Sequence, residues 1–134
     1  MLDYSPASLQ AIDEFISFTW GTKGESPDKE DYTPTPGKTI IIMQFGCYFG
    51  EVVRRLLGGR WEPNPDQPDS PLWTSLAIKP DVRIFPIARS FKRMKNGAED
   101  AMSPLLFQLI QQAKLDVNAV IAEGFLRQAD AFLN

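Results

Sequence analysis

The most constraining feature of the sequence is a long apolar repeat that runs from Lys38 to Leu57. Apolar side chains recur there at spacings of three and four residues over about five turns, which predicts an amphipathic helix. The alternative is a strand over residues 39–42, because the three isoleucines in this stretch favour strands. We expect the helix to end at Gly58, since glycine accepts the left-handed backbone needed just past a last turn. The apolar stripe comprises Ile42, Phe45, Phe49, Val52, Val53 and Leu56.

Two glycines, Gly46 and Gly50, lie four residues apart on one face of this helix. Each weakens the helix by about 1 kcal/mol relative to alanine. A neighbouring backbone that packs closely against this face would offset that cost, so we expect such a contact.

A carboxylate follows the second glycine. Glu51 stands three residues before Arg54 and four before Arg55, a spacing that predicts an ion pair on the helix surface. The alternative is an acid–base role for Glu51 beside an arginine anion clamp. No second carboxylate stands at a spacing that supports this role, so we rank it last.

The remaining elements follow from changes in periodicity and from turn residues. Ser5 caps a helix over residues 6–20, and Gly21 ends it. Residues 21–37 form an exposed acidic loop. Strands are expected over residues 60–63, 72–78 and 82–88, and further helices over 89–97, 104–114 (capped by Ser103) and 116–133. The pattern predicts a single α+β domain over residues 1–134, with a small antiparallel sheet packed against helices.

The composition excludes several kinds of catalytic site. The 134 residues contain no histidine and a single cysteine, Cys47. Without histidine there is no Ser-His-Asp triad, no activated cysteine pair and no histidine-based zinc site. Phosphate-binding glycine loops are also missing. We therefore expect a protein that is not an enzyme and needs no cofactor or metal, with Cys47 a small buried thiol.

Charge is distributed unevenly along the chain. Residues 1–37 carry seven acids and two bases, residues 38–97 ten bases and five acids, and residues 98–134 five acids and two bases. The net charge of -3 argues against a nucleic-acid partner, which requires a stronger basic excess. No apolar run of about 20 residues and no secretory signal is present, so we expect a cytoplasmic protein without a membrane partner.

Three surfaces are candidates for binding a partner. A charged loop can steer a partner of opposite sign, a basic cluster can bind an anion, and an exposed tryptophan can anchor a protein contact. The candidates are the acidic residues Glu25, Asp28, Glu30 and Asp31, the basic residues Arg89, Lys92 and Arg93, and Trp73 on the expected strand.

Several short motifs resemble those of a bacterial domain family of unknown function. The resemblance covers about residues 38–110 and implies an α+β fold, but no reaction. The loop over residues 64–71 and the last expected helix depart from it. The matching motifs are Gly46-x-x-x-Gly50-Glu51, Leu57-Gly58-Gly59-Arg60-Trp61, Phe85-Pro86 and Lys92-Arg93-x-x-x-Gly97.

At the level of class, the chain is similar to bacterial immunity proteins, which are small, cytosolic and made beside secreted toxins. That similarity implies a non-catalytic protein-binding protein that occludes the active site of a cognate toxin. The acidic segment 25–31 or the sheet surface around Trp73 would make the contact. The alternative is a domain that binds a small ligand or anion through the basic segment 89–95.

Overall fold

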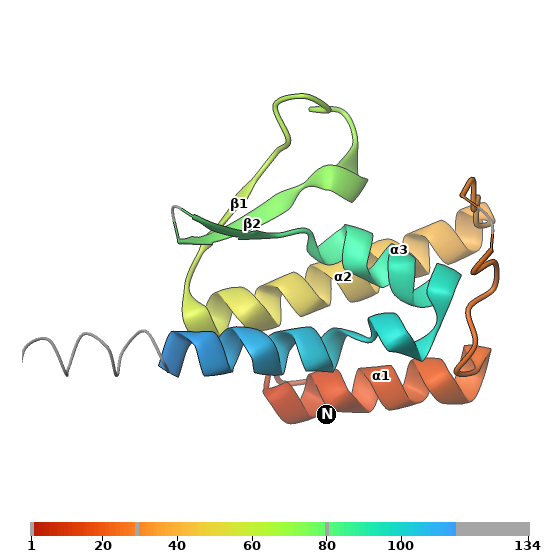
Figure 1. Cartoon of the computed structure of the whole chain (residues 1–134), viewed down its shortest axis with the longest axis horizontal. Helices are drawn as coiled ribbons and strands as arrows, with labels where there is room; N and C mark the ends of the chain where they lie inside the picture. Colours follow the sequence, from red (N-terminus) through yellow and green to blue (C-terminus); the bar gives the residue numbers. More distant parts are fainter. Residues whose placement is uncertain (1, 29, 80, 115–134) are drawn as a thin grey trace, which may run out of the picture.

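A computed structural model describes residues 2–28, 30–79 and 81–114, and it confirms the α+β class. Three antiparallel strands form a sheet in the order β1-β2-β3. Helix α2 lies between this sheet and α1 (Figure 1). In chain order the elements are α1 (Pro6–Trp20), α2 (Pro36–Leu57), β1 (Arg60–Glu62), the 3-10 helix η1 (Pro71–Trp73), β2 (Ser75–Lys79), β3 (Val82–Ile84), α3 (Pro86–Asn96), the 3-10 helix η2 (Ala98–Asp100) and a helix over residues 102–114.

Helix α2 is the centre of the fold. It begins two residues before the predicted start, because the side chain of Thr35 accepts a hydrogen bond from the Lys38 backbone N–H and Pro36 occupies the first helical position. It ends at Gly58, whose φ of 79° lies in the left-handed region. The strand alternative over residues 39–42 is therefore excluded.

The core gathers side chains from every layer. Most of the predicted α2 stripe is buried, but Leu56 is 45% exposed and Phe45 only half-buried. The buried apolar cluster comprises Leu9, Ile12 and Ile16 of α1, Ile42, Phe49, Val52 and Val53 of α2, Leu76 and Ile84 of the sheet, and Met94, Met102 and Leu106.

The two α2 glycines are close-packing positions, as predicted, but they have different neighbours. A Cβ on Gly46 would lie 2.5 Å from the Cα of Ile87, so the backbone of α3 rests there. A Cβ on Gly50 would lie 2.1 Å from Cη2 of Trp61, so an indole ring occupies that position instead of a backbone. The prediction of a backbone contact is correct for Gly46 and wrong for Gly50.

The predicted strands are too long at two points. Residues 71–73 form η1, and β2 starts only at Ser75. The strand predicted over residues 82–88 stops at Ile84, because Pro86 opens α3. A proline suits the first turn of a helix, where no backbone donor is needed. Helix α3 therefore begins three residues earlier than predicted, while Gly97 ends it as expected.

The helix over residues 102–114 takes its cap from another part of the chain. The carboxylate of Asp13, on α1, accepts the backbone N–H of Met102 at 3.1 Å and that of Ser103 at 2.7 Å. Ser103, predicted to be the cap, lies inside the helix instead. The helix predicted over residues 116–133 lies outside the described residues.

Candidate functional site

The acidic segment, residues 25–31, belongs to a loop that is fastened to α3. The backbone N–H of Glu25 donates to the carbonyl of Met94 at 2.9 Å, and that of Ser26 donates to the carbonyl of Lys95 at 3.1 Å. A Cβ on Gly24 would overlap the Lys95 carbonyl, so only glycine permits this approach. The loop stands at the end of the molecule where α1 finishes and α2 begins (Figure 1).

The four predicted acids of this segment do not share one role. Glu25 forms an ion pair with Lys38 and accepts a hydrogen bond from the Tyr32 hydroxyl at 2.7 Å. Its burial opposes ionisation, but the hydrogen bonds from Lys38 and Tyr32 outweigh that effect and lower its pKa. The three remaining acids, which are exposed and available to a partner, are Asp28, Glu30 and Asp31.

The basic residues predicted to form a surface cluster on α3 do not lie together, and the prediction is wrong for Arg93, which is buried. Its side chain is 1% exposed. The guanidinium donates to the Ser17 hydroxyl at 3.1 Å and to the Gly21 carbonyl at 2.9 Å, so it joins α3 to the end of α1. Burial lowers the pKa of Arg93, and the nearby carboxylate of Asp13 counteracts that shift. Arg93 is therefore a core residue that no partner can reach.

The other two basic residues, Arg89 and Lys92, lie in different environments. Arg89 donates to the Ala101 carbonyl at 2.9 and 3.2 Å and lies 3.6 Å from an Asp100 carboxylate oxygen. Of the three predicted basic residues, only Lys92 is exposed. Arg89, Lys92 and Arg93 therefore do not converge on one anion site.

Trp73 lies on η1, not on a strand, and it is half-buried. Its ring packs edge-to-face on Phe85 with centroids 5.9 Å apart.

The outer face of the neighbouring sheet carries a group of charged side chains joined by ion pairs, which was not predicted from the sequence. Its glutamate, Glu62, lies 2.7 Å from Arg60 and 2.6 Å from Arg83. Alternation of charged and apolar residues along strands β1 and β3 was the signal for this face.

The only acid–base candidate considered from the sequence, Glu51, is held in its ionised form. Arg54 donates to both of its carboxylate oxygens at 2.9 Å, and the Trp61 indole N–H donates at 2.8 Å. These hydrogen bonds lower the pKa of Glu51 to about 2, and those from Arg54 have the largest effect. A carboxylate with this pKa is a weak base at neutral pH. The predicted ion pair with Arg54 is confirmed.

Cys47 is exposed, which contradicts its prediction as a buried thiol. Desolvation and the nearby charge of Glu51 raise its pKa, which disfavours the reactive thiolate. Across residues 2–28, 30–79 and 81–114, no cluster of three carboxylate or thiol groups could hold a metal ion. In the same part of the chain, no helix has the length and apolar character that crossing a bilayer requires.

No protein-family model, curated protein or solved structure matches this chain. The resemblance to a domain family of unknown function stays a prediction based on its motifs. Within those motifs the structure assigns packing roles to Gly46, Gly50 and Trp61.

Proposed function

We propose that this chain is a non-catalytic protein-binding protein, and specifically a cytoplasmic bacterial immunity protein that occludes the active site of a cognate toxin. The observation that carries the proposal is the exposed acidic segment on a loop whose backbone is fastened to α3. Its contact residues would be Asp28, Glu30 and Asp31.

A fastened loop suits tight binding for a physical reason. Association normally costs free energy for ordering loops at the interface, and a loop that is already held avoids much of that cost. Exposed carboxylates also attract a positively charged surface over distances of about a Debye length, which raises the association rate. Toxins that act on nucleic acid carry such basic surfaces, because they must bind phosphate. An acidic segment would cover that surface and exclude the substrate.

The state of Glu51 further favours binding over catalysis. Its carboxylate is engaged by Arg54 and by the Trp61 indole, and the chain has no histidine to act in its place. The anion-binding alternative draws no support from the placement of Arg89 and Arg93, which are engaged within the fold.

The test is co-expression of the toxin encoded by the neighbouring gene, with and without this protein. We expect the protein to restore growth and to co-purify with the toxin. Absence of both rescue and co-purification would end the proposal.

The contribution of the acidic segment is tested with a charge-reversal variant, Asp28→Lys with Glu30→Lys and Asp31→Lys. The association rate should fall about ten-fold or more at low salt, and its salt dependence should flatten. Glu25 is left intact because it stabilises the loop. The matched control makes the same change of net charge at exposed acids elsewhere, as Glu14→Lys, Asp81→Lys and Glu99→Lys. Equal rates for the two variants would remove the segment from the mechanism.

A further inference from the structure

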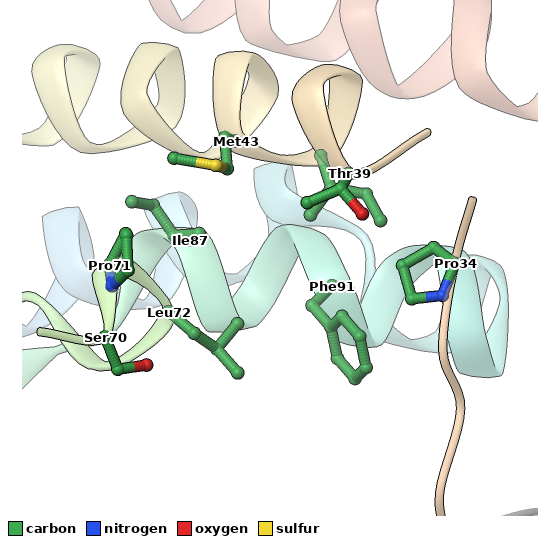
Figure 2. A pocket seen from close by; sticks show the side chains of 9 residues that line it. Pro34, Thr39, Met43, Ser70, Pro71, Leu72, Ile87 and Phe91 are labelled. Atoms are coloured by element: carbon green, nitrogen blue, oxygen red, sulfur yellow. The ribbon is translucent and has the colours of Figure 1, made fainter. Parts of the chain in front are cut away.

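An apolar pocket lies beside the acidic segment, between α2 and α3 (Figure 2). Its volume is about 210 Å³. Figure 2 shows Ser70 and Pro71, at the start of η1, at one end of the pocket and Pro34 at the other. The side chains that matter for the argument are Pro34, Thr39, Met43, Leu72, Ile87 and Phe91.

The pocket and the acidic loop are parts of one surface. Tyr32, from the loop, packs against the pocket residue Phe91 with ring centroids 5.2 Å apart. The hydroxyl of the same tyrosine donates to Glu25. Pro34, only three residues after Asp31, closes one end of the pocket. A partner that contacts the acids is therefore within reach of the pocket.

The size of the pocket limits what can enter it. An apolar cavity of about 150 Å³ accommodates a benzene ring, whereas sites for drug-sized ligands span about 300–1,000 Å³. The observed volume of about 210 Å³ suits one aromatic or long aliphatic side chain. Of these two kinds, aromatic side chains, tryptophan and tyrosine above all, are the more frequent buried anchors of protein interfaces.

Charge around the pocket restricts the occupant further. Exposed acids stand close in sequence to both ends, with Asp31 before Pro34 and Asp69 directly before Ser70. Lys38 is paired with Glu25, and Lys92 follows the pocket residue Phe91. Among the described residues of segment 25–31 and these flanking positions, five acids stand against two bases, so the rim has a net negative charge and favours a cationic neighbour for the anchor.

We propose that the pocket receives one aromatic side chain of the partner protein, carried on a loop with lysine or arginine on both sides of it. The anchor fills the space between Met43 and Phe91, while the flanking cations meet the acidic segment. This inference rests on the proposed function and specifies the chemistry of the partner. In this arrangement the acids set the association rate and the pocket sets the lifetime of the complex.

The first experiment titrates the full chain, labelled at its methionine methyl groups, with the capped peptide Lys-Lys-Trp-Lys-Lys. The methyl resonance of Met43, assigned with Met43→Leu, should shift and saturate, while those of the buried Met94 and Met102 stay in place. Lys-Lys-Ala-Lys-Lys and Glu-Glu-Trp-Glu-Glu should each bind at least ten-fold more weakly. If the alanine peptide bound equally well, binding would depend on charge alone and the aromatic anchor would be refuted. If the glutamate peptide bound equally well, the pocket would be a general apolar cavity with no preference for flanking cations.

A matched pair of variants tests the pocket itself. Thr39 lines the pocket from the exposed side of α2, so Thr39→Phe should fill it, whereas Thr39→Ala keeps it open. Peptide binding should be lost in the first variant and retained in the second. Ile40→Ala removes a neighbouring exposed side chain outside the lining and should have no effect. Peptide binding that is retained in Thr39→Phe would overturn the proposal. A shift of the Met43 methyl resonance that depends on protein concentration in the absence of peptide would also overturn it, and would assign the pocket to a second copy of the chain.

The same pair separates this inference from the proposed function. With the toxin as partner, Thr39→Phe should raise the dissociation rate at least ten-fold and leave the association rate nearly unchanged. A toxin complex that is sensitive to the reversal of Asp28, Glu30 and Asp31 but insensitive to Thr39→Phe would refute the pocket and leave the immunity function standing. Specific binding of the tryptophan peptide without any toxin complex would refute the immunity function alone.

Discussion

The substitution Gly50→Ala tests the contact between α2 and the Trp61 ring. The added Cβ would lie 2.1 and 2.3 Å from two ring carbons of Trp61 and 3.1 Å from Cγ of Pro86. The ring must move, and its N–H donates to the Glu51 carboxylate at 2.8 Å, so a displacement weakens a charge-assisted hydrogen bond.

The magnitude follows from three contributions. Overpacking costs about 1–3 kcal/mol, and loss of a hydrogen bond to a charged group costs about 1.5–3 kcal/mol. The higher helix propensity of alanine returns about 1 kcal/mol. We therefore expect the free energy of unfolding to fall by about 2–4 kcal/mol, which lowers the melting temperature by about 10 °C in a chain of this length.

The assay is urea unfolding followed by circular dichroism, with Gly37→Ala as the control. Gly37 lies on the same helix, and a Cβ there meets nothing within 4 Å, so this variant should be as stable as the parent or slightly more stable. Adding Trp61→Phe, which shortens the ring, should recover part of the loss caused by Gly50→Ala. Equal stability of Gly37→Ala and Gly50→Ala, or a strictly additive double variant, would refute the packing argument.

Three further outcomes follow from the contacts described above. The Glu51 carboxylate, with a pKa of about 2 against an ordinary 4.5, stabilises the fold above pH 4.5, and this contribution is lost as the pH falls toward 2. Because the side chain is 27% exposed, Glu51→Gln should lower the free energy of unfolding by only about 1–2 kcal/mol at pH 7 and by almost nothing near pH 2, and urea unfolding at both pH values checks this difference. Asp13→Asn should lower stability by about 1–3 kcal/mol, because its two oxygens cap separate backbone donors and an amide keeps only one acceptor; an unchanged urea midpoint would show that water replaces the cap. Inorganic phosphate at 10 mM should leave the melting temperature unchanged, because Arg89 and Arg93 do not converge; a saturable increase would restore the anion-binding alternative.

The sequence predicted those elements whose boundaries depend on local chemistry. Helix α1 has the predicted bounds, because Ser5 caps it and Gly21 terminates it. The end of α2 at Gly58 is equally local. At Pro86 local chemistry is ambiguous, since a proline can close a strand or open a helix. The packing of α3 against Gly46 resolves that ambiguity, and it is a tertiary contact that no residue near Pro86 reveals.

The candidate site was predicted only where exposure could be inferred from composition. The acidic segment is exposed, but the role of Glu25 depends on Lys38, thirteen residues away. Arg93 looked like part of a basic surface because charged residues are rarely buried. Two hydrogen bonds across more than 70 residues, to Ser17 and Gly21, make its burial possible. The pocket between α2 and α3 also depends on distant segments, so periodicity alone could not indicate it.

The cap that Asp13 provides has a consequence for biosynthesis. The residue that receives it, Ser103, stands 90 positions later in the chain. At about 5–20 residues per second, a ribosome needs roughly 5–20 seconds to add that length. During this interval the carboxylate lacks its partner, and α1 lacks the later helix that its apolar side faces. Until the second half of the protein has emerged, α1 can therefore pack against α2 but not against the helix over residues 102–114, so the final docking of α1 is a late step.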